Sequence, residues 1–205
     1  MIYTVFGKRG SGKTVLIQTY AKRCSRLLVW DVIGEYDDIG YVCTSLDEFL
    51  EQASERSEEH TFKLVYQPVH EKRDIDECFD VFLRTAWIMG GCMVIVDEID
   101  MLCTPAKVPP ELFKNLNLGR HRNLGLICAS RRPAQVPRLV TSQSDAIVYF
   151  MTIEPNDLAY VKDTVGKDGV QIVSHLPKYH CLVYRPGRGY AVEKNVDTGK
   201  ALPLH

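Results

Sequence analysis

The sequence predicts an α/β fold in which a mostly parallel sheet is covered by helices on both faces. Short apolar runs without polar alternation recur along the chain, as expected of strands that are buried on both faces. The run CMVIV at residues 92–96 is the most hydrophobic of them. Segments with the apolar spacing of amphipathic helices separate these runs, and parallel strands need such crossover connections.

The predicted elements alternate along the chain, and several of their ends carry recognisable signals. Ser45 and Glu48 form a capping box at the start of one helix, Gly90 follows the end of another, and Pro109 lies near the first turn of a third. The pattern RPGRG at residues 185–189 predicts a C-terminal hairpin. Strands are predicted at residues 2–6, 27–32, 41–44, 62–66, 92–96, 124–129, 146–151, 179–184 and 190–193, and helices at 15–26, 45–56, 74–89, 109–118, 137–142 and 156–165.

Length and composition limit the class of protein. The 205 residues are 45% hydrophobic and 25% charged, which predicts one soluble domain over residues 1–205. No apolar run reaches the roughly 20 residues of a membrane span, and a strand that begins at residue 2 leaves no room for a signal peptide. The formal net charge of −1 means that any nucleic-acid binding needs a local basic patch. The seven cysteines include no Cys-x-x-Cys pair, which argues against a zinc site and favours a reducing compartment.

Residues 7–14 read GKRGSGKT and fit the phosphate-binding loop of P-loop NTPases, although an ordinary glycine-rich turn is the alternative interpretation. A predicted strand precedes the loop and a predicted helix follows it, as that motif requires. Glycines let the backbone N–H groups approach a polyphosphate at the helix N-terminus. We expect Lys13 to bind the β- and γ-phosphates of ATP and Thr14 to bind Mg²⁺. The predicted nucleotide-binding residues are Gly7, Lys8, Arg9, Gly10, Ser11, Gly12, Lys13, Thr14 and Val15.

Asp97 and Glu98 follow the apolar residues 93–96 and match the second signature of P-loop ATPases. At the carboxyl end of a buried parallel strand, Asp97 can hold Mg²⁺ through water. Glu98 can orient and deprotonate the attacking water, which favours a hydrolase over a small-molecule kinase, because the acceptor is the nucleophile in a kinase. Residues 62–66, a strand candidate, lie between the two signatures in the sequence. We therefore expect another strand between the strands that carry the phosphate loop and the acidic pair, as in RecA-like (ASCE) ATPases.

Residues 105–138 are rich in Lys and Arg and contain one acid, Glu111, so they form either a solvated surface or a DNA-binding surface. Residues 119–150, GRHRNLGLICASRRPAQVPRLVTSQSDAIVYF, resemble the HerA/FtsK superfamily of DNA-pumping ATPases. Residues 31–36, DVIGEY, resemble the Asp…Gly-Glu-Tyr segment of its HerA-like members. With both signatures, the resemblance covers roughly residues 2–185 and is greatest to the genome-packaging ATPases of tailless, internal-membrane (tectivirus-like) viruses. The basic residues are Lys107, Lys114, Arg120, Arg122, Arg131, Arg132 and Arg138.

The resemblance implies roles for three arginines. Arg122, or as second choice Arg120, would be the finger that reaches the γ-phosphate bound to a neighbouring subunit. Arg131 stands where many members carry Gln or another amide as γ-phosphate sensor. It would read the γ-phosphate by charge or bind DNA phosphate instead, and Ser130 is the alternative sensor.

The resemblance implies an ATP- and Mg²⁺-dependent motor that forms a homo-oligomeric, hexameric ring and translocates double-stranded DNA without sequence preference. It would package a viral genome in the host cytoplasm or at the packaging vertex of the virion, with capsid or membrane vertex proteins as further partners. The alternatives are another HerA/FtsK-type chromosome or plasmid motor, a Zot-like phage assembly ATPase, a small-molecule kinase, and a nucleotide switch. A Zot-like protein usually carries a membrane span, and the sequence predicts none here.

Overall fold

A nine-stranded sheet runs through residues 1–194, the part of the chain that the computed structural model describes. Its order is β3-β4-β2-β5-β6-β1-β7-β8-β9. Strands β1 to β7 run parallel, whereas β8 and β9 pair antiparallel, so the predicted parallel sheet with a terminal hairpin is confirmed. The strands are β1 (Ile2–Phe6), β2 (Arg26–Trp30), β3 (Tyr41–Cys43), β4 (Phe62–Tyr66), β5 (Met93–Val96), β6 (Gly125–Ser130), β7 (Ala146–Tyr149), β8 (Cys181–Arg185) and β9 (Gly189–Glu193).

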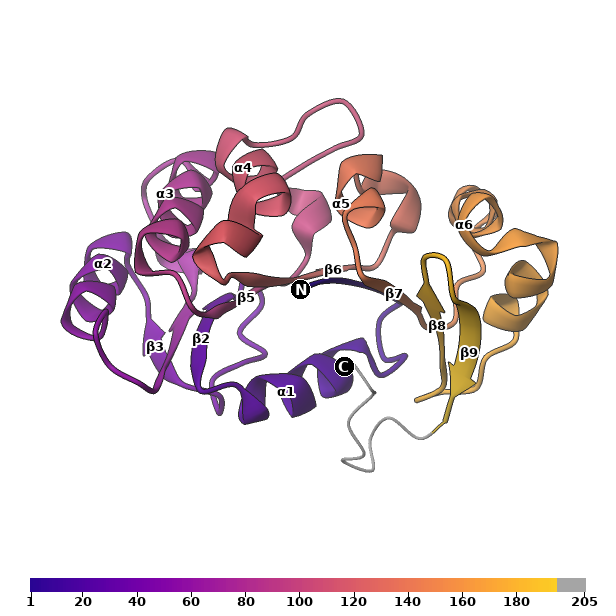
Figure 1. Cartoon of the computed structure of the whole chain (residues 1–205), viewed down its shortest axis with the longest axis horizontal. Helices are drawn as coiled ribbons and strands as arrows, with labels where there is room; N and C mark the ends of the chain where they lie inside the picture. Colours follow the sequence, from indigo (N-terminus) through magenta and orange to yellow (C-terminus); the bar gives the residue numbers. More distant parts are fainter. Residues whose placement is uncertain (195–205) are drawn as a thin grey trace.

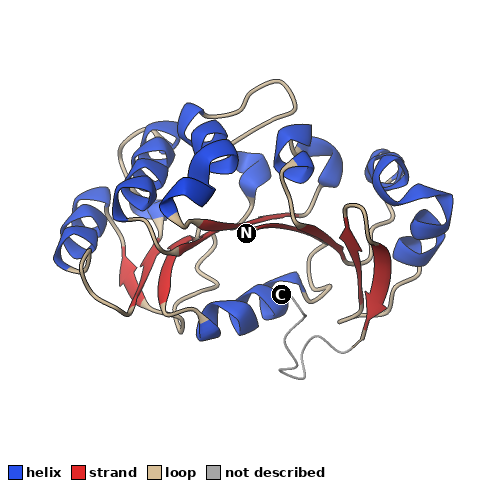
Figure 2. Cartoon of the chain, in the orientation of Figure 1, coloured by secondary structure: helices blue, strands red, loops and turns tan. Residues whose placement is uncertain are grey.

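Helices cover both faces of the sheet unequally, as Figure 1 shows. Helix α1 lies on one face, whereas α2 to α6 lie on the other, and the sheet is the middle layer between them (Figure 2). No helix among residues 1–194 is long and apolar enough to cross a membrane. The prediction of one domain extends over residues 195–205, which lie outside the described residues. The helices are α1 (Lys13–Arg23), α2 (Leu46–Glu55), α3 (Ile75–Met89), α4 (Pro110–Leu118), α5 (Arg138–Ser142) and α6 (Pro155–Ser174).

Strand β6 lies between β1 and β5, which confirms the expected insertion of a strand between the two that carry the signatures. The chain reaches β6 only after β5, and residues 62–66 form β4 on the far side of β2. The insertion separates the phosphate loop from the acidic pair by one strand. Side chains of ordinary length can therefore meet across the gap at the carboxyl ends of the three strands.

Strand β2 is buried on both faces, which explains its continuous apolar run. Leu27 and Val29 pack in the cluster beneath the sheet that includes residues of α1, whereas Leu28 and Trp30 pack in the larger cluster with α2 and α3. The Trp30 indole is fully buried and meets three aromatic rings edge-on, with centroids 5.0 to 5.5 Å away. These rings belong to Tyr66, Phe79 and Phe82.

Two helices differ from their predicted bounds by more than one residue. Helix α1 ends at Arg23 rather than at residue 26, because Cys24 is extended and Arg26 already belongs to β2. Helix α6 runs on to Ser174, well beyond the predicted end at residue 165. Gly166 interrupts it with a φ of 78°. The part of α6 after Gly166 packs closely on the part before it. A Cβ added at Gly169 would lie only 2.3 Å from a methyl of Val165.

We expect Trp30→Ala to lower the free energy of unfolding by about 3–5 kcal/mol, the usual cost of removing a large aromatic side chain from a core. Trp30→Phe should cost much less, because the buried indole N–H has no hydrogen-bond partner among the described residues and no bond is lost. Denaturant unfolding followed by circular dichroism measures both. Equal losses in the two variants would contradict this account of the core.

Candidate active site

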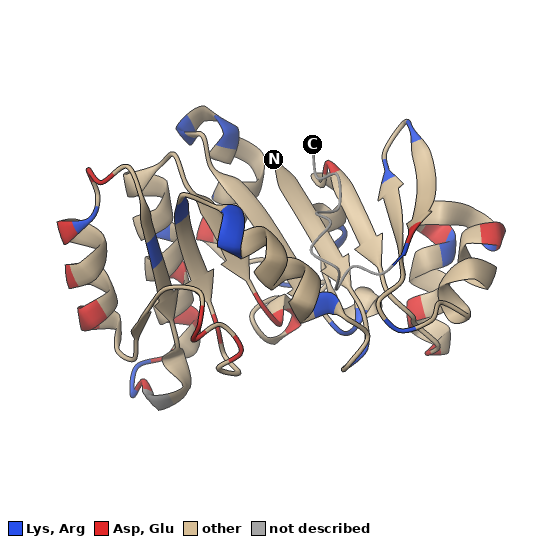
Figure 3. Ribbon diagram, turned by 90° about the horizontal axis from the view of Figure 1, so that it is seen from below, with Lys and Arg blue, Asp and Glu red and all other residues tan. Residues whose placement is uncertain are grey.

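The residues of both signatures meet at one edge of the sheet. Residues 7–12 follow β1, the acidic pair follows β5, and Arg131 follows β6, so all three segments leave the sheet at the carboxyl ends of parallel strands. Acidic and basic residues gather near the arrowheads of these strands (Figure 3). The structure brings together Lys13, Asp97, Glu98 and Arg131.

The loop at residues 7–12 depends on its glycines for backbone conformation and for close packing. Gly10 and Gly12 have φ values of 75° and 115°, in the left-handed region that L side chains rarely adopt. A Cβ at Gly7 would lie 2.6 Å from the Cβ of Phe150. Gly12 stands at the N-cap of α1 and offers no capping side chain, so the first N–H groups of the helix remain available to an anion.

The Ser11 hydroxyl identifies a further position that suits a phosphate oxygen. It is buried and has no hydrogen-bond partner among the described residues. An unpaired buried hydroxyl is unfavourable, and a ligand oxygen would satisfy it. The loop therefore fits a polyphosphate by its backbone and by this side chain.

Lys13 is buried and paired with both acids. Its Nζ lies 2.8 Å from Asp97 Oδ1 and 3.6 Å from Glu98 Oε1, and its exposed fraction is 6%. A triphosphate in the loop would offer the ammonium other anionic partners at the start of α1. Lys13 thus links phosphate binding to the two carboxylates.

Glu98 is held in a strained conformation by its surroundings. Its φ of 50° is left-handed, which is uncommon for a residue with a Cβ and is found at functional sites. Its Oε1 accepts a hydrogen bond of 2.6 Å from Arg131 Nε. Burial raises the pKa of Glu98 and nearby Asp97 adds to the increase, whereas Lys13 and Arg131 oppose it. A raised carboxylate pKa suits a general base that works near neutral pH.

The loop after β2 completes the site and was only partly anticipated from the sequence. The Glu35 carboxylate accepts a hydrogen bond of 2.7 Å from the Thr14 hydroxyl. The Tyr36 hydroxyl donates to Asp97 Oδ2 over 3.1 Å. Burial, followed by the charge of Asp97, raises the pKa of Tyr36 well above its usual value, so this phenol stays a donor.

Asp31 organises the loop that carries Glu35 and Tyr36. Its buried carboxylate accepts bonds from the backbone N–H groups of residues 33–36, at 2.9 to 3.2 Å. Four donors satisfy the buried charge and fix the turn. In the sequence, Asp31 was marked only as an acid at the end of a buried strand, shortly before Gly-Glu-Tyr. Its bonding role could not be derived from that pattern.

The predicted magnesium ligands fit Mg²⁺ in the chemistry of their donors. These ligands are the Thr14 hydroxyl and the Asp97 carboxylate, which offer hard oxygen atoms, and the Glu35 carboxylate beside Thr14 offers another. Among the side chains that the structure describes, no cluster of three or more His, Cys, Asp or Glu could hold a metal alone. Mg²⁺ commonly takes one or two carboxylates together with substrate phosphates, and such a site needs no protein cage.

A cavity of about 210 Å³ opens between the phosphate loop and two residues that sequence reasoning missed, Lys178 and Tyr179. They lie between α6 and β8, and the Tyr179 N–H donates to Ser11 O over 2.9 Å. Nothing in the local sequence marks them, because only the fold brings the end of α6 back to a loop near the N-terminus. Glu35 and Arg131 also line this cavity.

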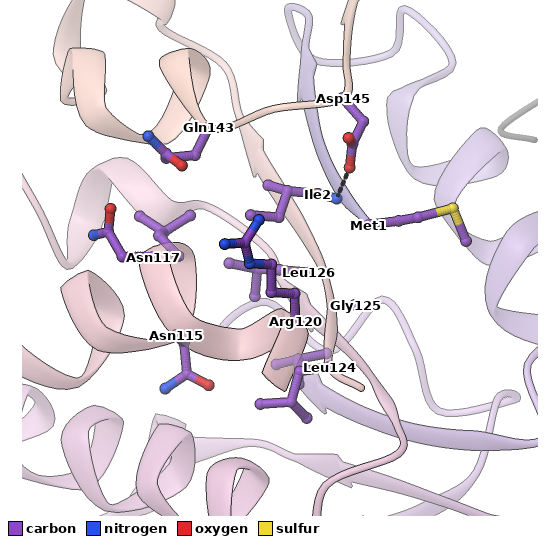
Figure 4. Close-up of a pocket in the computed structure, with 12 residues that line it drawn as sticks. Met1, Ile2, Asn115, Asn117, Arg120, Leu124, Gly125, Leu126, Gln143 and Asp145 are labelled. Carbon is purple, nitrogen blue, oxygen red and sulfur yellow. Dashed lines mark hydrogen bonds between the residues drawn. The ribbon is translucent and has the colours of Figure 1, made fainter. Parts of the chain in front are cut away.

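The two candidate finger arginines lie at the other end of the sheet, in the 3-10 turn η3 (Gly119–Arg122) that precedes β6. The Arg122 guanidinium donates to the carbonyls of Trp87 and Ile88, over 3.0 and 2.7 Å, and so caps the end of α3. Arg120 is exposed and lines a separate cavity of about 420 Å³ (Figure 4). Its side chain has no hydrogen-bond or ion-pair partner among the described residues. Neither arginine can reach the phosphate loop of its own chain.

Most of the other basic residues between 105 and 138 have acidic partners, so this segment is not one continuous basic patch. The partners come from elsewhere in the chain in most cases, which the local charge count could not reveal. These pairs are Lys107 with Asp76, Lys114 with Glu111, Arg132 with Asp157, and Arg138 with Asp163.

Comparisons with known proteins agree with this fold. Residues 3–152 match the model of the family "ATPase family associated with various cellular activities (AAA)". The genome packaging NTPase B204 of Sulfolobus turreted icosahedral virus 2, solved in complex with ATP-gammaS, is 26% identical with a TM-score of 0.79, over 95% of this chain and 97% of that one. B204 of Sulfolobus turreted icosahedral virus, a DNA-packaging ATPase, is 26% identical with a TM-score of 0.73, over 94% and 96% of the two chains.

A more distant structure shares the fold alone. VirB4 of Thermoanaerobacter pseudethanolicus is 12% identical with a TM-score of 0.66, over 94% of this chain and 88% of that one. No curated protein sequence matches the chain. The resemblance that the sequence shows to HerA/FtsK-type P-loop ATPases is confirmed. The chain therefore belongs to the AAA family of ATPases.

Proposed function

We propose that the protein is an ATP-hydrolysing motor that translocates double-stranded DNA and packages a viral genome. The observation that carries the proposal is the meeting of Lys13, Asp97, Glu98 and Arg131 beside the phosphate loop, in a fold that matches the genome packaging NTPase B204 over almost its whole length. We place its work in the host cytoplasm or at the packaging vertex, with capsid or membrane vertex proteins as partners. A HerA/FtsK-type motor with another cargo is the second candidate, and the shared fold of VirB4 supports it.

The ion pairs suggest how nucleotide binding would prepare the site. A triphosphate would take the Lys13 ammonium, now paired with Asp97, and the N–H groups at the start of α1. Thr14 and Asp97 would hold Mg²⁺, which supplies positive charge to the phosphate oxygens when bound. Glu35 lies next to Thr14 and can support the same ion through its carboxylate.

Glu98 would act as the general base, with Arg131 controlling its availability. The 2.6 Å bond from Arg131 occupies one carboxylate oxygen of Glu98. A γ-phosphate offers Arg131 an anionic partner with matching geometry, so phosphate binding would free Glu98 to orient water. This coupling favours a hydrolase over a kinase, because a kinase has no use for a base that faces water. It also disfavours a switch that rarely hydrolyses.

We place the trans finger at Arg120 rather than at Arg122. The Arg122 guanidinium already satisfies two carbonyls of α3, whereas Arg120 is exposed beside a cavity. Both lie at the amino ends of the strands, opposite the phosphate loop. A head-to-tail ring brings opposite faces of neighbouring subunits together, so a hexameric ring would present η3 of one copy to the nucleotide of the next.

The direct test of the proposal is phosphate release with and without duplex DNA. We expect DNA of any sequence to stimulate turnover, and the stimulation to fall steeply as salt rises, because phosphate contacts release counterions. Lys13→Ala should be inactive in both conditions and serves as control. A rate of phosphate release that does not change when duplex DNA is added would contradict the motor and favour the kinase or the switch.

We expect Glu98→Gln to keep ATP binding and to lower turnover by a factor on the order of 10² or more, the scale of a lost general base. The unprotonated carboxylate is the active form, so activity falls as pH drops through the pKa of Glu98. Arg131 lowers this pKa in the nucleotide-free protein, and Arg131→Ala should therefore shift the acid limb of the pH profile of kcat/KM, which reports the free enzyme, to higher pH. A limb that stays in place would mean that Glu98 is not the titrating base.

We expect Arg120→Ala to lower turnover by roughly 10³–10⁵, the scale of an arginine finger. Mixed with Lys13→Ala, it should regain part of the activity, because one mutant supplies a sound nucleotide site and the other a sound finger. Arg122→Ala is the matched control: it should cost about 1 kcal/mol of stability through the lost bonds to α3 and keep most of the turnover. Normal turnover by Arg120→Ala, or a mixture that assembles without activity, would contradict the assignment.

A further inference from the structure

The nucleotide-binding cavity contains one aromatic side chain that the phosphate chemistry does not use, Tyr179. It lines the cavity together with the loop residues, Glu35, Arg131 and Lys178. Lys13 and Arg131 suit phosphate oxygens, and Thr14 and Glu35 suit a metal. A ribonucleotide also has a flat aromatic base, and nothing else that lines the cavity offers a flat ring to its face.

Several contacts hold Tyr179 in place against the phosphate loop. Its N–H bonds to Ser11 O, and a Cβ at Gly12 would lie 2.8 Å from its ring atom Cδ1 and 3.3 Å from its Cα. Its φ of 62° is left-handed, a conformation that is uncommon for a bulky residue and that surrounding structure must enforce. The ring is half-buried, so part of it remains accessible from the cavity.

A cation now covers this ring. The Lys178 ammonium lies over Tyr179, 4.7 Å from the ring centroid. Lys178 is exposed, so it can move aside without loss of a packed position. An exposed cation–π contact is weaker than the stacking of a base on an aromatic ring. A nucleobase can therefore replace the ammonium, which remains close enough to meet a phosphate.

We propose that Tyr179 is the platform on which the nucleobase stacks. This inference rests on the proposed nucleotide site. It adds that the segment between α6 and β8 binds the base, whereas the loop binds the phosphates. The cavity lining includes no Asn or Gln that could read a base edge. Stacking uses the π-face common to all bases, so Tyr179 provides affinity with little discrimination between ATP and GTP.

The test is calorimetric titration of the full chain with three ligands: AMPPCP, GMPPCP and inorganic tripolyphosphate. Tyr179→Asn removes the ring, and Asn tolerates the left-handed backbone. We expect it to weaken AMPPCP binding roughly 5- to 150-fold, the range for loss of one base–aromatic stack. Tripolyphosphate binding should not change. Tyr179→Phe should behave as wild type, and Tyr190→Asn, the same change at an exposed tyrosine of β9, should have no effect.

The outcomes are distinct. Equal weakening of AMPPCP and tripolyphosphate would mean that Tyr179 only supports the loop, and unchanged AMPPCP binding would mean that the base lies elsewhere. Either result overturns the proposal. A preference of more than about tenfold between AMPPCP and GMPPCP would overturn the claim of weak base discrimination. Failure of the wild type to bind even tripolyphosphate would instead remove the phosphate site on which the proposed function depends.

Discussion

The buried contact between Lys13 and the two carboxylates of Asp97 and Glu98 is the constraint around which the site is built. Ions taken out of water need close partners of opposite charge, or their burial is strongly unfavourable. Lys13 has an exposed fraction of 6%, Asp97 of 1% and Glu98 of 5%. The three meet only because β6 separates β1 from β5 by one strand and all three strands end at the same edge. The order of the strands and the pairing of these buried charges therefore depend on each other.

This cluster explains why nucleotide binding would reorganise the site. A triphosphate brings several negative charges to a loop whose lysine already has two anionic neighbours. The Asp97 carboxylate would then lose its ammonium partner, and a divalent cation is the natural replacement. Tyr36 donates to the other Asp97 oxygen, and this bond would hold the carboxylate in position while its counter-charge changes. The charge balance therefore supports the proposed Mg²⁺ site independently of the motif.

The sequence predicted the parts of the site that are local, and missed the parts that depend on distant packing. The phosphate loop, the acidic pair and nearly every strand follow from short patterns, because burial on both faces leaves a continuous apolar run. Arg122 illustrates the limit: the family resemblance suggested a finger, but its bonds to the carbonyls of α3 become visible only in three dimensions. Tyr179 carries no local signal at all, and the left-handed φ of Glu98 is set by surroundings from β5, β6 and α1.

The same charge argument applies to Arg131, at the position where the resemblance to the HerA/FtsK superfamily led us to expect an amide. An amide can bind a γ-phosphate but cannot neutralise a carboxylate. With Lys13 alone, the two buried acids would carry one uncompensated negative charge, whereas Arg131 brings the cluster of Lys13, Arg131, Asp97 and Glu98 to two charges of each sign. The arginine thus balances the charge of the nucleotide-free site and occupies one carboxylate oxygen of Glu98. An amide at this position would restrain Glu98 less. We therefore expect Arg131→Gln to change the nucleotide-free site as well as the rate of hydrolysis.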